Sequence, residues 1–152
     1  MNITLSKRGD YAIRAVLDMS RCYGSGRRKT REIAEAMNIP PKYLSQILAV
    51  LVRHKVLTAV AGQDGGYELA RPPQDLRLLD VVEVVEGPTT LQRCLLRGIP
   101  CGTDGTCAVH DAWSSAQQAL TDRLAATTFA ELTANDHTTA GHAHDDDGAA
   151  SA

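Results

Sequence analysis

The first 55 residues alternate apolar and polar positions with the period of three short helices. Segments 6–23, 31–37 and 41–55 each place apolar side chains three and four residues apart, which predicts one buried face per helix. A glycine-containing basic loop separates the first two segments, and Thr30 is expected to be the N-cap of the second. The clearest apolar stripe belongs to the third segment and consists of Leu44, Ile47, Leu48 and Leu51.

The other side of the third segment is polar and basic. Its positions, again at helical spacing, are Lys42, Ser45, Gln46, Ala49 and Arg53. Two short helices joined by a tight turn, the second with a hydrogen-bonding outer face, form a helix-turn-helix, whose second helix enters the major groove of DNA. We expect Ser45 or Gln46 to contact base edges, with Tyr43 beside them. Lys42 and Arg53 are expected to contact phosphates.

A hairpin follows these helices. Strand-like segments 57–61 and 67–70 flank the glycine-rich run 62–66, which is typical of a β-hairpin. A hairpin directly after a helix-turn-helix predicts a winged helix. The DNA contacts expected outside the third helix are Thr30, Arg31 and Gln63.

Beyond the hairpin the pattern predicts further helices at 78–86 and 108–126, and one more turn at 127–133. The long helix carries its apolar residues on one stripe, namely Val109, Trp113, Ala116, Leu120 and Leu124. So small a domain leaves little chain to cover this stripe, so we expect the helix to pair with a second copy in a homodimer. Residues 134–152 lack apolar side chains to bury and are expected to be disordered.

The charge distribution along the chain changes what the overall composition implies. The 152 residues carry a net charge of −2, which argues against a nucleic-acid partner. Residues 1–55, however, hold eleven Lys and Arg against four Asp and Glu, a balance of +7. Residues 56–133 and 134–152 balance to −5 and −4. A basic first third therefore indicates a polyanion-binding module joined to parts with other tasks.

Three of the four cysteines lie in one glycine-containing loop. Cys94, Cys101, Cys107 and His110 follow the spacing C-x6-C-x5-C-x2-H. Thiolates hold iron–sulfur clusters or zinc, and structural zinc usually takes cysteine pairs two to four residues apart, which this loop lacks. A cluster is therefore favoured over zinc. Cys22, alone near the end of the first helix, is interpreted as a buried structural residue.

The predicted fold is mainly α, a winged helix-turn-helix domain with a cysteine-rich cluster-binding loop and a long C-terminal dimerisation helix. We place the DNA-binding domain at 1–75, the loop and dimerisation helix at 76–133, and a tail at 134–152. No apolar run is long enough to span a membrane, and no signal peptide is evident, so a cytoplasmic location without membrane association is expected. Thiols stay reduced there, which argues against a disulfide framework.

Several motifs in order resemble one family, the winged helix-turn-helix iron–sulfur-cluster transcriptional regulators of the IscR and NsrR type. The resemblance covers residues 1 to about 134 and rests on Leu5–Ala15, Ile39–Leu44, Gly65–Pro72, Asp80–Val82, the cysteine loop and Ala130–Leu132. It implies a homodimeric regulator with a cluster bound by three cysteines and one other residue. The family commonly has an arginine before the first wing glycine, where this chain has Ala61; that difference shifts weight onto the third helix.

The resemblance carries the three cysteine ligands to Cys94, Cys101 and Cys107. His110 matches the histidine of 2Fe-2S members, and Asp10 matches the acidic ligand of 4Fe-4S members. The pattern Cys107-x2-His110-x2-Trp113 favours His110 and a 2Fe-2S cluster. The first cysteine interval is six residues rather than five, so nuclearity stays open.

The leading hypothesis is a DNA-binding transcriptional regulator that senses redox state, nitric oxide or iron–sulfur status through a cluster. The alternative is a winged-helix regulator without a cluster, using its thiols directly or zinc. An enzyme or electron carrier is disfavoured, because no catalytic arrangement is evident and a carrier would not need a basic helix-turn-helix.

Overall fold

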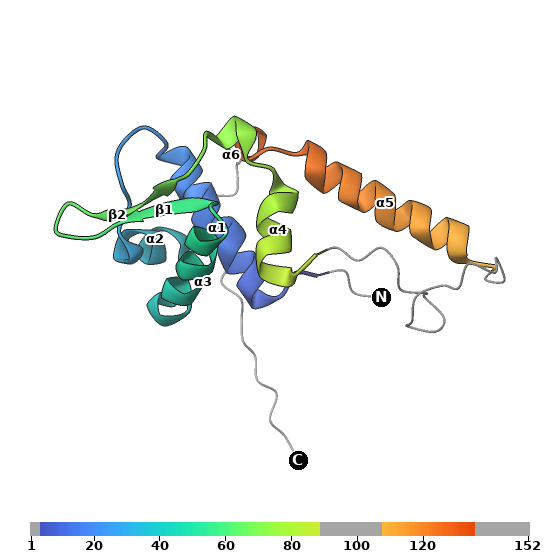
Figure 1. Ribbon diagram of the computed structural model, residues 1–152, viewed down its shortest axis with the longest axis horizontal. Helices are drawn as coiled ribbons and strands as arrows, with labels where there is room; N and C mark the ends of the chain where they lie inside the picture. The colour runs from blue at the N-terminus through green and yellow to red at the C-terminus, as the bar shows by residue number, and fades with distance from the viewer. Residues whose placement is uncertain (1–3, 89–107, 136–152) are drawn as a thin grey trace, which may run out of the picture.

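The computed structural model describes residues 4–88 and 108–135. Figure 1 shows a helical body from which a two-stranded hairpin and one long helix extend. In chain order the elements are α1 (Lys7–Arg21), α2 (Thr30–Met37), α3 (Pro41–Arg53), β1 (Leu57–Val60), β2 (Gly66–Leu69), the 3-10 turn η1 (Pro73–Asp75), α4 (Leu78–Glu86), α5 (His110–Ala126) and α6 (Phe129–Ala134). The predicted mainly α winged helix-turn-helix fold is confirmed.

Helix α1 lies at the centre and packs against α2, α3, α4 and α6. Ser6 caps it, because its side-chain oxygen accepts a hydrogen bond from the Gly9 backbone N–H at 3.2 Å. Small and branched side chains, Ala12, Ala15 and Val16, are fully buried on its inner face. Small residues at these positions let neighbouring helices approach closely on several sides.

The turn between α2 and α3 is sharp. Asn38 closes α2 in the left-handed conformation, with φ of 51°, and Pro41 occupies the first turn of α3. The predicted apolar stripe of α3 is buried: Leu44, Leu48 and Leu51 are fully inaccessible and Ile47 is 3% exposed. The polar stripe therefore faces outward, as the spacing predicts.

Strands β1 and β2 pair antiparallel, in the register Leu57 with Leu69 and Val60 with Gly66. The observed strands are one residue shorter or shifted by one relative to the predicted segments. Leu57 and Leu69 are buried at the base of the hairpin, whereas the tip is exposed. The base of the hairpin is thus packed into the core of the domain.

The chain after α5 returns to the same core. Thr128 forms a β-bridge with Arg77, and the Phe129 N–H donates to the Leu76 carbonyl at 2.9 Å. Phe129 is completely buried in the cluster that includes Leu76 and Val81. One core therefore takes residues from both sides of position 75; the division at that position stays a prediction.

Helix α5 extends away from the body (Figure 1) and has no buried residue along its length. Residues 89–107, with the three loop cysteines, and residues 136–152 of the predicted tail lie outside the described residues. The predicted tail begins at 134, but Ala134 still belongs to α6. Among the helices of 4–88 and 108–135, none is long and apolar enough to cross a membrane.

Candidate nucleic-acid interface

The exposed side of α3 presents the residues expected to contact DNA. Lys42, Gln46 and Arg53 are exposed, and Tyr43 is 58% exposed. Ser45 is also exposed, but its hydroxyl donates to the Pro41 carbonyl at 3.1 Å. Its proton is therefore used within the helix, and its oxygen remains available as an acceptor. Gln46 is the residue on this face whose amide can both donate to and accept from a base edge.

The start of α2 differs in detail from the prediction. Thr30 is the first helical residue rather than the N-cap, because Lys29 already takes the extended cap conformation and its N–H donates to the Glu32 carboxylate at 2.8 Å. Arg31 is exposed and its Nε donates to Glu35 Oε1 at 2.8 Å, which raises the pKa of Arg31. Contact of Arg31 with a phosphate would compete with this pair.

The tip of the hairpin is exposed, with Gln63 between Gly62 and Asp64. Gly62 has φ of 103°, a conformation that favours glycine. The Gly65 N–H closes the tip by donating to the Gly62 carbonyl at 3.1 Å. The tip can therefore present backbone groups and the Gln63 side chain.

Two further basic residues, Lys7 and Arg8, lie next to this surface, although the sequence pattern does not predict that position. A groove of about 640 Å³ lies between the start of α1 and α3, and brings Lys7 and Arg8 beside Tyr43 and Gln46. Tyr11 and Ile47 form part of its wall. The basic balance of residues 1–55 is the signal in the sequence, but it does not reveal which cations gather next to α3.

Asp10, one of the two proposed fourth ligands, is held by a residue of its own helix. Arg14 Nε donates to Asp10 Oδ1 at 2.9 Å, and a second bond joins Arg14 Nη2 to Asp10 Oδ2. The hydrogen bond from Arg14 to Asp10 raises the pKa of Arg14. Arg14 also donates to the Met37 carbonyl at 3.1 Å, so the pair secures the end of α2.

His110, the other proposed fourth ligand, is exposed at the first position of α5. Its ring forms no hydrogen bond to another described residue, whereas its carbonyl accepts from Ser114 Oγ at 2.7 Å. Cys94, Cys101 and Cys107 lie outside the described residues. Within 4–88 and 108–135, no three His, Cys, Asp or Glu side chains gather into a metal site. Cys22 is half-buried and unpaired, rather than buried as expected.

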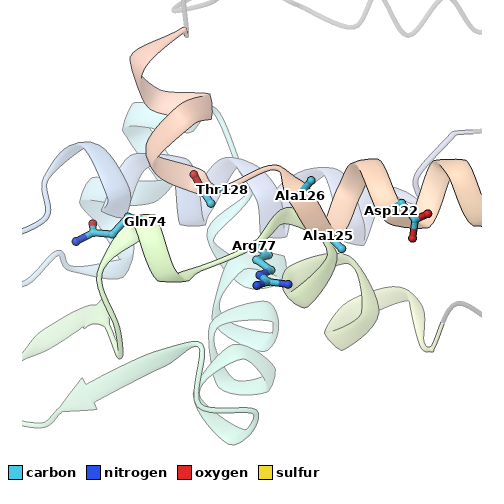
Figure 2. A pocket seen from close by; sticks show the side chains of 6 residues that line it. All are labelled: Gln74, Arg77, Asp122, Ala125, Ala126 and Thr128. Atoms are coloured by element: carbon cyan, nitrogen blue, oxygen red, sulfur yellow. The ribbon is translucent and has the colours of Figure 1, made fainter.

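The other end of α5 meets the winged domain at a shallow pocket of about 350 Å³. Figure 2 shows its lining from three parts of the chain, namely Gln74, Arg77, Asp122, Ala125, Ala126 and Thr128. The Leu78 N–H donates to the Thr127 carbonyl at 2.9 Å just beside it. This junction sets the direction in which α5 leaves the winged domain.

Comparison with known proteins agrees with this architecture. The family model for Rrf2, described as an iron-dependent transcriptional regulator, matches residues 5–135. The helix-turn-helix-type transcriptional regulator IscR of Sodalis glossinidius is 30% identical over 132 residues, which cover 87% of this chain and 79% of that protein.

Solved structures give the same result. IscR of T. potens superposes with a TM-score of 0.73 at 26% identity, covering 93% of this chain and 95% of that one. CymR, the global cysteine regulator of B. subtilis, superposes with a TM-score of 0.77 at 23% identity, covering 89% and 99%. These matched proteins are regulators and not enzymes, and the matched region spans the helix-turn-helix, the wing and α5. The chain belongs to the Rrf2 family of winged helix-turn-helix, DNA-binding transcriptional regulators.

Proposed function

We propose that this regulator senses redox state, nitric oxide or iron–sulfur status through a cluster bound by Cys94, Cys101, Cys107 and one non-cysteine ligand. The observation that carries the proposal is the position of His110. His110 is the first residue of α5 and follows Cys107 by three positions. In the sequence, the three thiols and this imidazole therefore end at the start of the helix that extends from the DNA-binding body. Soft thiolates with one imidazole suit iron in a cluster.

We assign the fourth ligand to His110 rather than Asp10. Ligation by Asp10 would disrupt its two hydrogen bonds with Arg14, a side chain that also donates to the Met37 carbonyl. The exposed His110 ring gives up no hydrogen bond to a described residue on binding a metal. A histidine ligand favours the 2Fe-2S form, with 4Fe-4S as the alternative.

The protein is proposed to act as a homodimer joined through α5. Leu120 is 43% exposed on a helix without a buried residue. Trp113 Nε1 and Gln117 Oε1, one turn apart on this helix, are inaccessible and have no hydrogen-bond partner among the described residues. Because these two groups are already inaccessible within one chain, the dimer contact is argued from the exposed apolar stripe around Leu120, which a second copy would cover.

On DNA, two α3 helices of the dimer would enter successive major grooves about 34 Å apart. Gln46 would read base edges, whereas Lys42, Arg53, Lys7 and Arg8 would meet phosphates. A change of the cluster would alter the segment between α4 and α5 and so the spacing of the two α3 helices, which a fixed operator tolerates poorly. Since its target is a double-stranded DNA operator, the protein is proposed to work in the cytoplasm.

Anaerobic reconstitution tests the sensing step. The loaded protein should absorb visible light, native mass spectrometry should give the cluster mass, and operator affinity measured on the same sample should differ between loaded and cluster-free protein. Cys101→Ala should abolish the absorbance and this difference, whereas Cys22→Ala should keep both. Zinc in the purified protein, or thiol oxidation as the only modulator of binding, would favour the alternative regulator without a cluster. Equal operator affinity with and without the cluster would overturn the sensing proposal.

A further inference from the structure

The loop between α1 and α2 contacts one edge of the β1–β2 hairpin, which is called the wing below. The Arg28 N–H donates to the Tyr67 carbonyl and the Tyr67 N–H donates to the Arg28 carbonyl, both at 2.8 Å. Residue 28 therefore adds a one-residue third strand beside β2. Figure 1 shows this loop passing next to the hairpin, which extends beyond the helices.

The side chain of Arg28 forms hydrogen bonds to Asp18, near the C-terminal end of α1. Arg28 Nε donates to Asp18 Oδ2 at 3.0 Å and Arg28 Nη2 donates to Asp18 Oδ1 at 3.1 Å. The Asp18 side chain is only 8% exposed and that of Arg28 25%. This hydrogen-bonded pairing raises the pKa of Arg28. A forked pair of this kind fixes orientation as well as distance, which a single contact does not.

The backbone contact on the wing side is equally close. Gly66 has φ of 146°, and a Cβ at this position would lie 2.7 Å from the Arg28 carbonyl oxygen. Only glycine lets the two backbones approach this closely. The backbone of Arg28 therefore holds the wing, and the side chain of Arg28 is in turn held by Asp18.

We propose that Asp18 is a positioning residue for DNA recognition, because through Arg28 it sets the direction in which the wing points relative to α3. This rests on the proposed function, DNA binding by this regulator, and on the predicted contact of Gln63 at the wing tip with DNA. Strands of four residues are about 13 Å long, so a 20° tilt at the base moves the tip by about 5 Å. Such a displacement exceeds what a hydrogen bond tolerates. Asp18 thus governs contacts at the flank of the site, whereas α3 governs those at its centre.

Two operator fragments separate these contributions. One contains the flanking base pairs beyond the two α3 half-sites, and the other ends at the half-sites. Asp18→Asn removes the charge and half of the fork while keeping the size of the side chain. We expect about tenfold weaker binding to the long fragment and less than a twofold change on the short one. Hydroxyl-radical footprinting should lose protection at the flanks and keep it at the centre.

Three further variants complete the test. Gly66→Ala disturbs the contact between the wing and the Arg28 backbone, and should give the same loss of affinity for the long fragment. Arg28→Lys should give a smaller loss of affinity for that fragment. Asp122→Asn, the same loss of charge at an exposed position on α5 where the carboxylate accepts only from Gln118 among the described residues, is the matched control and should leave the ratio of the two affinities unchanged. Circular dichroism establishes that each variant is folded, and Gly66→Ala and Arg28→Lys carry the test if Asp18→Asn does not fold.

The outcomes are distinguishable. If wild-type protein itself binds both fragments equally and protects no flank, the predicted contact of Gln63 at the wing tip with DNA is wrong, whereas the DNA contacts of α3 in the proposed function still stand. If wild type protects the flank and folded Asp18→Asn and Gly66→Ala protect it equally well, the positioning role of Asp18 is overturned. Equal losses on both fragments would likewise contradict it, because they would indicate a general effect on the fold.

Discussion

Gly9 lies so close to Glu86 that a Cβ at position 9 would stand 2.2 Å from Glu86 Oε1. That oxygen accepts from the Ser6 N–H at 3.0 Å and from the Ser6 hydroxyl at 2.6 Å. The start of α1 is thereby tied to the last residue of α4. The carboxylate also faces the positive end of the α1 dipole, which adds a favourable interaction.

A double-mutant cycle on Gly9 and Glu86 should reveal this tie. With Glu86→Ala already present, Gly9→Ala should stabilise the protein by about 0.5 kcal/mol, because alanine favours a helix over glycine. In the wild-type background the same change should be less favourable by about 1 kcal/mol, because it displaces the carboxylate from Ser6. Urea unfolding of the four proteins measures the coupling. Additive effects would contradict the contact.

Phe129→Ala should lower the free energy of unfolding by about 3–5 kcal/mol, since it empties a fully buried aromatic site. Phe129→Leu should cost less, because most of the volume is retained. Denaturant titration gives both values. A cost for Phe129→Ala below about 1 kcal/mol would mean that α6 does not belong to the core of the winged domain.

Leu120→Asp should convert dimers into monomers at micromolar concentration without unfolding the winged domain, because it places a charge on the apolar stripe of α5. Ser115→Asp, at an exposed position on the other side of that helix, is the matched control and should remain dimeric. Sedimentation velocity measures the oligomeric state. A dimeric Leu120→Asp would place the subunit interface elsewhere.

The two proposed fourth ligands can be separated by spectroscopy. His110→Ala should change the visible absorbance of the reconstituted cluster and lower its stability, whereas Asp10→Asn should leave the absorbance as in wild type. Asp10→Asn should instead reduce stability by about 1 kcal/mol, since it weakens the bonds to Arg14. The reverse pattern would assign the cluster to Asp10.

Arg53→Ala and Gln46→Ala should weaken DNA binding in different ways. Loss of Arg53 should lower affinity for operator and random DNA alike and reduce the salt slope by about 1. Loss of Gln46 should cost about 1–3 kcal/mol on the operator alone and relax its sequence preference. Fluorescence anisotropy at several salt concentrations measures both. Equal losses by both variants on both DNAs would contradict the assignment.

Within residues 4–88 and 108–135, the spacing of apolar residues predicted the six α-helices and both strands to within a few residues, because an amphipathic face is a local property of the chain; the 3-10 turn Pro73–Asp75 was not predicted. The stripe from Leu44 to Leu51 and the turn residues of the hairpin are examples. The N-cap of α2 was misplaced by one residue, since Thr30 and Lys29 compete for the cap and the Glu32 side chain, bonded to the Lys29 N–H, favours Lys29. Cysteine spacing indicated a cluster, and that part of the candidate site stays a prediction.

Partners distant in sequence could not be predicted from spacing. Three such contacts require the packed arrangement of several elements: the hydrogen bonds of Arg28 with Asp18 and Tyr67, the burial of Phe129 beside Leu76, and the groove that Lys7 and Gln46 line together. Sequence by itself determined the helical periodicity and the polar stripe of α3, because these depend on neighbours within a few residues. It also indicated the family, because the order of short motifs along the chain can be compared without knowing the fold. Tertiary structure alone decided which charges are paired, where the wing is seated and where α5 departs, because through-space contacts form only once the common core excludes water.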